Sequence, residues 1–315
     1  MMQLRILGMN GPFPESGGAT SGYLVTDGDT ALCLDLGCGT LGALTSLTKP
    51  EDLNGILFSH WHYDHTSDVL PLLYRLQAAG RQMDIWGPED AKSPIRSILE
   101  AETAVRLHVL KPGDTLKVGQ VEIQVFRAVH PVPALMFRLT DSDGVLCYTG
   151  DTNAHGDLLD FARGADILLA DGLFPEADWT ASKPHLSARR CAELARDARA
   201  GQLIITHLNP NYAGETLLQE ARTVFHETAL ARRMDLWHVS RDGNYFYYVD
   251  SVDKAVTYQW KVLHDGWELD GENGHPSIML HIGQSGEDSL YLTVSDECGY
   301  TASRSLLIQS SVGII

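Results

Sequence analysis

The sequence predicts an α/β sandwich of two mixed sheets with helices on their outer faces, followed by a small all-β module. Strand-like apolar segments alternate with amphipathic helical segments in two similar halves. Polar residues of metal-binding types directly follow several of these strands. After Asp250 apolar residues occupy every second position, which is typical of β-strands. We therefore expect one domain over residues 1–250 and a β module over residues 251–315.

The first half begins with a β-hairpin and continues into a buried strand and a helix. Two apolar segments, 23–25 and 31–34, flank Asp27-Gly28-Asp29, a strong hairpin signal. The next apolar segment, 55–58, predicts a strand. Apolar residues then recur at intervals of three and four from Val69 to Leu76, so we expect a helix whose apolar side faces the core.

The second half and the tail show the same kinds of strand and helix pattern. In the second half we expect strands at 121–126, 134–140, 145–148 and 203–205, and helices at 186–200 and 215–231. In the tail we expect strands at 256–262, 277–282 and 289–294, separated by turns at 270–274 and 286–288.

A run of six residues carries the main functional signal. His60-Trp61-His62-Tyr63-Asp64-His65 follows the predicted strand 55–58 and contains three imidazoles and a carboxylate. Zinc binds nitrogen and oxygen ligands at about 2.0–2.2 Å, and catalytic sites leave one coordination position open for water. His60 and His62 can share one ion while Asp64 and His65 reach a second. Two metals then need further ligands from elsewhere in the chain.

Three later residues are candidates for those ligands. His130 follows the strand at 121–126, Asp151 lies in the segment CYTGDT, and His207 lies in THLNP after the strand at 203–205. Each stands where a strand meets a loop, which is where an α/β scaffold places functional groups. A single histidine in such a place is as often structural as functional, so the repetition carries the prediction.

HxHxDH, a later histidine, TGDT and THLNP together resemble the metallo-β-lactamase superfamily of αββα metal hydrolases, over about residues 1–250. The hairpin segments also fit, as does the segment 238–243 before the aromatic strand 244–249. The resemblance implies that His60, His62 and His130 bind one metal, and that Asp64, His65 and His207 bind the other. Asp151 would lie between the two ions.

One further segment resembles the ribonuclease Z and phosphodiesterase branch of this superfamily. Lys183-Pro184-His185-Leu186-Ser187-Ala188 matches its HxSxxxxA element, which implies that His185 assists the leaving oxygen of a phosphate ester. Asp171 occupies the place of the acidic residue that orients this histidine, although the family often has glutamate there. Structural alternatives are a helix start capped by Ser187 and an Asp-Gly turn at Asp171.

The spacing of the motifs separates relatives within that branch. His130 and Asp151 are 21 residues apart, enough for two strands and a turn. Ribonuclease Z carries a long glycine-rich arm between these motifs that grips transfer RNA, and this chain has no room for it there. The short spacing resembles the small phosphodiesterases, including those that open cyclic phosphates.

The charge of the chain argues against a long nucleic acid as partner. It has 24 lysines and arginines against 41 acidic residues, a net charge of −17, and no run of basic residues exceeds two. A polyanion-binding protein normally shows a basic stripe. A small phosphate ester remains compatible, because two divalent ions supply positive charge locally.

These observations predict a dinuclear metal hydrolase. The ligand types suit Zn²⁺, while Mn²⁺ and iron accept similar sets. We expect a metal-activated water to attack phosphorus, with Asp64 orienting it and His185 protonating the departing oxygen. The rivals are a lactone or thioester hydrolase, which leaves the His185 element unexplained, and a non-catalytic metal-bound sensor or assembly protein.

The role of the β module and the location of the protein are also expectations. The module would serve as a packing appendage or homodimer interface, or border the metal cleft through Trp260, His264 or Trp267. No signal peptide is evident, and no apolar run approaches the roughly 18 residues of a membrane span. Five cysteines without a CxxC pair indicate neither a disulfide framework nor a cysteine zinc site. We therefore expect a cytoplasmic protein without membrane contact.

Overall fold

The computed structural model describes residues 1–240 and, beyond them, 244–248, 255–262, 267–270, 277–282, 286–296 and 301–310. The chain divides into two compact units, Met1–Val239 and Ser240–Ile315, and each is considered by itself. Among the described residues, no helix has the length and apolarity that crossing a bilayer requires.

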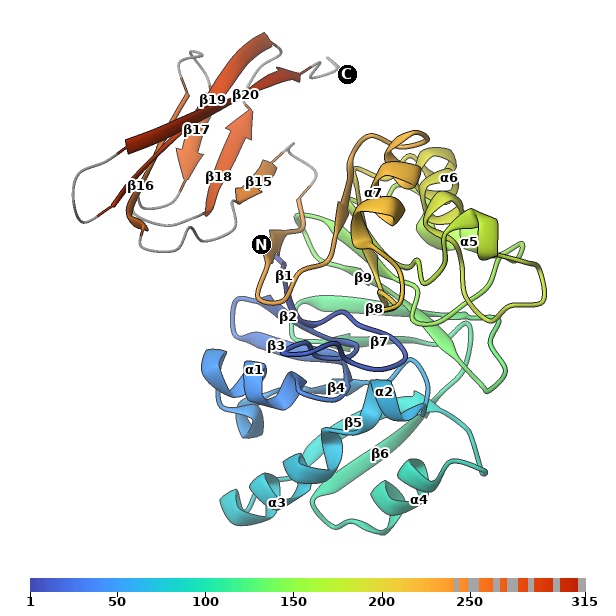
Figure 1. The fold of residues 1–315 in the computed structure, drawn as a ribbon. Helices are drawn as coiled ribbons and strands as arrows, with labels where there is room; N and C mark the ends of the chain where they lie inside the picture. The colour runs from blue at the N-terminus through green and yellow to red at the C-terminus, as the bar shows by residue number, and fades with distance from the viewer. Residues whose placement is uncertain are drawn as a thin grey trace. The chain divides into compact units, whose positions relative to one another are not determined.

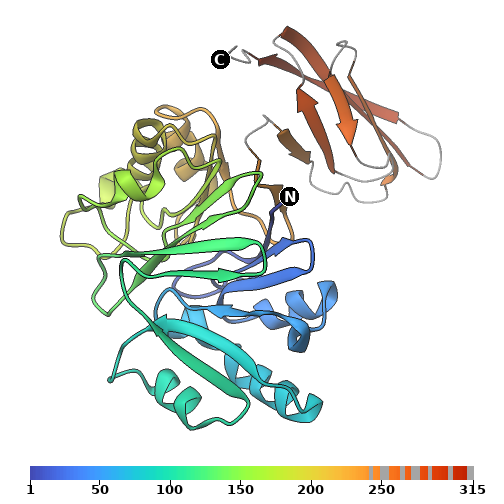
Figure 2. The same cartoon turned by 180° about the vertical axis from the view of Figure 1, so that it is seen from behind.

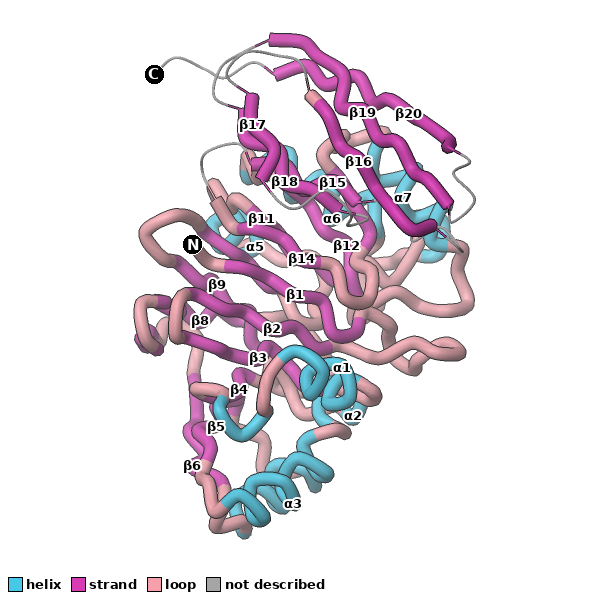
Figure 3. The backbone as a smooth tube through the Cα atoms, turned by 90° about the vertical axis from the view of Figure 1, so that its left-hand side faces the viewer, coloured by secondary structure: helices cyan, strands magenta, loops and turns pink. Residues whose placement is uncertain are grey.

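The first seven-stranded sheet contains the strands of the first half of the unit, together with β14 (Leu236–His238) at one edge (Figure 3). From β14 its order continues through β1 (Gln3–Gly8), β2 (Gly22–Asp27), β3 (Thr30–Leu36), β4 (Gly55–Leu57), β5 (Met83–Pro88) and β6 (Val105–Leu110). The predicted hairpin is present as β2 and β3, which pair in antiparallel register up to Asp27 and Thr30. Strands β3 to β6 are parallel.

The second seven-stranded sheet contains the strands of the second half. Its order is β13 (Thr228–Leu230), β12 (Gln202–Thr206), β11 (Ile167–Asp171), β10 (Val145–Tyr148), β9 (Leu135–Thr140), β8 (Val121–Arg127) and β7 (Thr115–Val118). Strands β10 to β13 are parallel, and β7 to β10 form antiparallel pairs. Both sheets are therefore mixed, as predicted.

Three apolar clusters show the layer order helix, sheet, sheet, helix (Figures 1 and 2). One cluster fills the space between the sheets, with Ile6, Leu34, Phe137 and Ile204 among its members. The second joins the first sheet to α1 (Thr40–Leu47), α3 (Val69–Ala79) and α4 (Pro94–Ala101). The third joins the second sheet to α5 (Leu158–Ala162), α6 (Ala188–Ala198) and α7 (Gly214–Arg222). The αββα sandwich predicted from the sequence is thus confirmed.

Short turns complete the unit. They are α2 (Tyr63–Thr66), inside the histidine-rich run, and the 3-10 turns Pro50–Asp52 and Glu176–Asp178. Because β4 is parallel to β3 and β10 to β12 are parallel to one another, the loops that leave these strands gather at common sheet edges. Those loops carry most of the predicted site residues.

One predicted helix is wrong over half of its length. The segment 215–231 was expected to be helical throughout, but α7 ends at Arg222 and β13 follows at Thr228–Leu230. Strand β13 pairs with β12, with Thr228 opposite Leu203. Local spacing of apolar residues cannot reveal this pairing, because its partner lies more than twenty residues earlier in the chain.

The described residues of the second unit form two three-stranded sheets. One has the order β15 (Asn244–Tyr248), β18 (Ser277–Ile282), β17 (Trp267–Asp270), and the other β16 (Ala255–Lys261), β19 (Gly286–Asp296), β20 (Thr301–Ser310). The three predicted tail strands correspond to β16, β18 and β19, so the expected all-β module is confirmed.

Two details of the tail differ from expectation. Residues 286–288 were predicted as a turn but begin β19, where Gly286 pairs with Ser310 of β20. The units divide after Val239 rather than after Asp250, because the aromatic strand 244–248 pairs with β18 instead of with the first unit. Most of the predicted turn at 270–274 and His264 lie outside the described residues, whereas Trp260 is buried.

Candidate metal centre

The first group of predicted ligands meets beyond the end of β4. His60 Nε2 lies 2.9 Å from His62 Nδ1, which lies 3.1 Å from His130 Nε2. Asp151 completes the group, with its Oδ2 3.6 Å from His60 Nε2 and 4.0 Å from His130 Nε2. These four residues offer ligand atoms that all lie within 4.8 Å of one another.

The second group lies beside the first. His207 Nε2 is 3.1 Å from Asp64 Oδ2, and His65 Nε2 is 3.6 Å from the same oxygen. Asp151 faces this group as well, through contacts of 3.2 Å to His65 Nε2 and 3.5 Å to His207 Nε2. The structure therefore brings all seven residues together in the two groups that the sequence suggests, with Asp151 between them.

The donor atoms fit divalent metal ions. His65 Nε2 and Asp151 Oδ1 are buried and 3.2 Å apart, yet neither has a hydrogen-bond partner among the described residues. Leaving such groups unsatisfied is costly in a folded protein, unless another ligand completes them. Imidazole and carboxylate donors at this spacing are typical ligands of zinc and related ions. The two clusters can thus hold metal ions.

The two ligand groups differ in the direction in which the pKa of a histidine is shifted. Burial lowers the pKa of His60 well below its ordinary value, and the neighbouring His65 lowers it further. Burial also opposes protonation of His207, but Asp151, Asp171 and Asp64 prevail and raise its pKa to about 10. Without metal, protons on the second group neutralise the buried carboxylates. Metal binding must displace those protons.

In three of the candidate ligand histidines, Nδ1 contacts a residue outside the two groups, so that Nε2 points into the site. His130 Nδ1 donates to the carbonyl of Pro184 at 3.2 Å, and His65 Nδ1 donates to Asp35 Oδ2 at 2.8 Å. His60 Nδ1 lies 3.1 Å from Ser59 Oγ. In each case Nε2 is left for a ligand bond, since an outer partner fixes which ring nitrogen carries the proton.

Asp35 is the residue that sequence reasoning missed. Besides His65, its carboxylate accepts hydrogen bonds from the Ser59 amide at 2.7 Å, from Ser59 Oγ at 2.8 Å and from the Tyr148 hydroxyl at 2.5 Å. It is fully buried, and its backbone is left-handed at φ 55°. The signal was an acidic residue inside the apolar segment ALCLDL, because a buried carboxylate needs partners.

Replacing Asp35 by asparagine is expected to weaken metal binding by about 10–100-fold, the usual cost of removing an outer partner of a ligand. The amide keeps the shape but loses the charge that holds His65. Titration of the metal-free protein with Zn²⁺ measures the effect. Asp29→Asn, in the exposed turn before β3, is the matched control. Equal affinities of the two variants would contradict this role of Asp35.

His185 and Asp171 form a pair at the edge of the metal groups. His185 Nδ1 donates to Asp171 Oδ2 at 2.7 Å, so aspartate reaches the imidazole despite being shorter than glutamate. His185 Nδ1 lies farther, 3.8 Å, from Asp151 Oδ2. Asp151, Asp171, His185 and His207 also bring four ligand atoms within 4.8 Å of one another. Because the Nδ1 proton of His185 is engaged by Asp171, we assign no metal to this nitrogen. The capping role of Ser187 is also present, because its Oγ accepts from the Arg190 amide at 3.2 Å.

Asp171 also faces a second histidine. Its Oδ1 lies 3.4 Å from Nδ1 of His207, whose Nε2 points to Asp64. The last residue of β11 therefore stands behind both His185 and His207. The side chain is fixed because the Asp171 amide donates to Thr149 Oγ1 at 3.0 Å and its Oδ2 accepts from the Thr152 amide at 3.2 Å.

Gly11 packs directly against the ring of His207. The loop after β1 pairs with the loop after β12, since the Leu208 amide donates to Met9 O and the Gly11 amide donates to Leu208 O. A methyl group at Gly11 would lie 2.1 Å from His207 Nε2, far closer than atoms can approach. No larger residue fits here without moving His207.

Gly11→Ala is therefore expected to displace His207 and to weaken metal binding to the second group by about 10-fold or more, with a smaller effect on the first. Metal analysis after dialysis at limiting Zn²⁺ gives the readout. Gly42→Ala is the control, because a methyl group there meets nothing within 4 Å. Full metal content in Gly11→Ala would contradict this packing argument.

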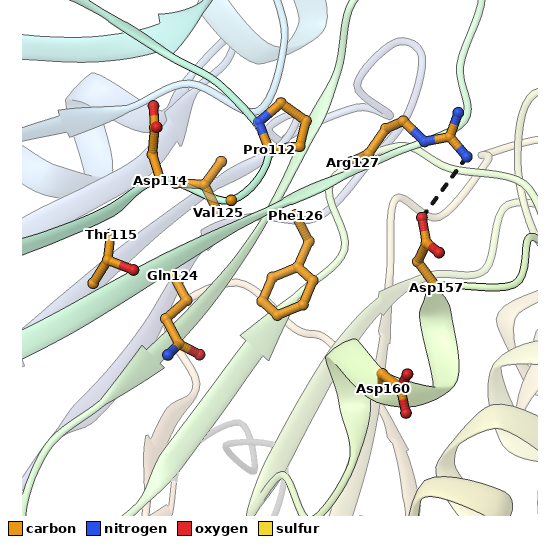
Figure 4. A pocket seen from close by; sticks show the side chains of 10 residues that line it. Pro112, Asp114, Thr115, Gln124, Val125, Phe126, Arg127, Asp157 and Asp160 are labelled. Carbon is orange, nitrogen blue, oxygen red and sulfur yellow. Dashed lines mark ion pairs between the residues drawn. The ribbon is translucent and has the colours of Figure 1, made fainter.

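A separate pocket of about 420 Å³ lies on the second sheet, away from these residues (Figure 4). Its lining comes from the loop before β7, from β7, from β8 and from the region of α5. Asp114, Asp157 and Asp160 face it against the single cation Arg127, whose guanidinium lies 3.7 Å from Asp157. This negative balance disfavours an anionic ligand.

Comparison with known proteins agrees with the fold. Residues 37–208 match the beta-lactamase superfamily domain, and residues 239–308 match a PKD-like domain. A probable metallo-hydrolase, YhfI of Bacillus subtilis, is 30% identical over 75% of this chain and 99% of its own length. The crystal structure of YhfI superposes with a TM-score of 0.72, covering 75% of this chain and 98% of that one.

Two further similarities are to a ribonuclease Z and to a diphosphatase. Ribonuclease Z of Methanopyrus kandleri is 24% identical over 73% of this chain and 95% of its own length. The structure of a diphosphatase of the PhnP family, 17% identical, shares the fold with a TM-score of 0.59 over 75% of this chain and 96% of that one. With the domain match and the YhfI similarity, these findings show that the chain belongs to the beta-lactamase superfamily of metallo-hydrolases, in its ribonuclease Z-like branch.

Proposed function

We propose that this metallo-hydrolase is a phosphodiesterase that acts on a small or cyclic phosphate ester. The observation that carries the proposal is the His185–Asp171 pair, joined by a 2.7 Å hydrogen bond beside the seven candidate ligands. The pair belongs to the segment that resembles the ribonuclease Z and phosphodiesterase branch, and this favours a phosphodiester over a lactone or thioester. In cleavage of a phosphodiester the pair would protonate the departing alkoxide.

We propose two divalent ions at the site, Zn²⁺ first, with Mn²⁺ or iron as alternatives. His60, His62 and His130 would hold one ion, Asp64, His65 and His207 the other, and Asp151 would touch both. When bound, such ions supply a nucleophile at neutral pH and stabilise charge on phosphoryl oxygens.

The side chains of the protein would orient the attacking water and protonate the leaving oxygen. Asp64 is only partly buried, and its Oδ2 can accept a hydrogen bond from the attacking water while it faces His207. Asp171 holds the Nδ1 proton of His185, so that Nε2 of the imidazolium can deliver its proton to the leaving oxygen. Water adds to phosphorus, the ester P–O bond breaks, and the alcohol departs neutral.

The overall charge supports a small substrate. With a net charge of −17, the chain repels a polyanion at long range. Local positive charge would come from the metal ions. Long nucleic acid is therefore not part of the proposal.

A substrate panel tests this function. The protein loaded with Zn²⁺ or Mn²⁺ is assayed on bis(4-nitrophenyl) phosphate, a cyclic nucleotide, an acyl-homoserine lactone and a glutathione thioester. We expect the phosphodiesters to give the highest kcat/KM. Lactone or thioester turnover above that of the diesters would overturn the proposal, and absence of any turnover would favour a metal-bound sensor.

We also propose a cytoplasmic location and a homodimer formed through the second unit. The described cysteines, Cys33, Cys38, Cys147 and Cys191, are all free thiols, which suits a reducing compartment. Fractionation of the source cells tests the location. Light scattering of the full chain tests the dimer.

A further inference from the structure

Hydrogen bonds to its backbone hold the segment Lys183-Pro184-His185 beside the candidate metal centre. Asn153, two residues after Asp151, donates from its side-chain amide to the carbonyl of Lys183. The next carbonyl, of Pro184, accepts from His130 Nδ1 at 3.2 Å. His185 is then held by Asp171. The position of Lys183 is therefore set by two candidate site segments rather than by a free loop.

The ammonium group of Lys183 lies over an aromatic ring that also contacts His185. Lys183 Nζ is 4.1 Å from the centroid of Phe174. That ring meets the imidazole of His185 edge-on at a centroid distance of 6.0 Å, and the ring of Tyr212 at 6.3 Å. Phe174 thus contacts both the ammonium of Lys183 and the imidazole of His185.

Among the described residues no ion pair joins Lys183 to a carboxylate, although acidic residues outnumber basic ones in the chain. Its basic neighbour Arg190 is different, because it pairs with Glu176 at 2.9 Å and stacks on Trp179 at 3.4 Å. An aromatic face attracts an ammonium without neutralising it. Lys183 is therefore available to an anion from outside the protein.

We propose that Lys183 is a specificity-determining residue that binds a second anionic group on the leaving-group side of the substrate. The proposal rests on the phosphodiesterase function and narrows its substrate class. The preferred ester carries a phosphate or carboxylate on the alcohol that departs toward His185. The ammonium attracts that group, while His185 protonates the oxygen of the breaking bond.

Two pairs of probes test this role. The substrates are methyl 4-nitrophenyl phosphate and methyl 3-carboxy-4-nitrophenyl phosphate, which differ by one carboxylate on the leaving group. The wild-type protein should favour the carboxylated ester, and Lys183→Met should lower that preference in kcat/KM by about 10-fold, as expected for one lost charged hydrogen bond. Lys183→Arg should restore it. Lys92→Met, at an exposed lysine, is the matched control.

Binding separates failure of this role from failure of the phosphodiesterase proposal. Calorimetry of the metal-loaded protein with phenyl phosphate and 4-carboxyphenyl phosphate needs no turnover. We expect the carboxylated ligand to bind more tightly than phenyl phosphate. Lys183→Met should lower the ratio of the two affinities by about 10-fold. Equal affinities in the wild type, no binding of either ligand, or an equal loss for both ligands in the variant would overturn the role of Lys183. Absence of turnover alone would overturn only the phosphodiesterase function.

Discussion

Asp151→Asn is expected to cause the largest single loss of both metal and activity. Asp151 is the carboxylate that faces both groups, at 3.6 Å from His60 Nε2 and 3.2 Å from His65 Nε2. Burial disfavours its charge, but His207, His65 and His60 hold the pKa of Asp151 well below its ordinary value. The amide keeps the size of the side chain and removes the charge that balances these imidazoles and any bound cations.

We therefore expect kcat/KM to fall by more than about 100-fold, since even removal of an outer partner of a ligand costs about 10–100-fold. Bound metal should fall in parallel, as measured by elemental analysis. Asp157→Asn is the matched control, because it lies six residues later and its side chain is exposed. Full metal content in Asp151→Asn, with an unchanged circular dichroism spectrum, would refute the shared-ligand role.

His185→Gln is expected to separate chemistry from metal binding. The variant should keep its metal, because the side chain donates to Asp171 and is not counted among the ligands. Its kcat should fall by about 10²–10⁴-fold on esters with alkoxide leaving groups, the usual contribution of a general acid. The fall should be much smaller with 4-nitrophenol, because this leaving group departs without a proton.

This dependence on the leaving group distinguishes a proton donor from a residue that only supports the fold. His226→Gln is the control, because His226 is 90% exposed and contacts the adjacent Glu227. A kcat that fell equally for both classes of ester, or a loss of metal in His185→Gln, would show that His185 acts through structure instead.

The candidate ligands could be named from the sequence because each of them carries a local signal. A cluster such as HxHxDH, or a histidine directly after an apolar strand, can be seen without knowing what lies opposite. Asp35 had no such signal beyond its apolar surroundings. Its function depends on Ser59, His65 and Tyr148, which the chain brings to it from 24, 30 and 113 residues away. The same limitation explains why β13 was not predicted, because this strand forms by pairing with β12.

By itself, the sequence determined the αββα order and the all-β tail and singled out the seven candidate ligands, because periodicity and residue type are local properties. Only the tertiary structure decided which ring nitrogen each histidine presents, that Asp171 stands behind both His185 and His207, and that no carboxylate among the described residues pairs with Lys183. These features depend on distances between segments that are remote in the chain. Such distances are fixed by the packing of the two sheets and their loops, not by the spacing of residues along the polypeptide.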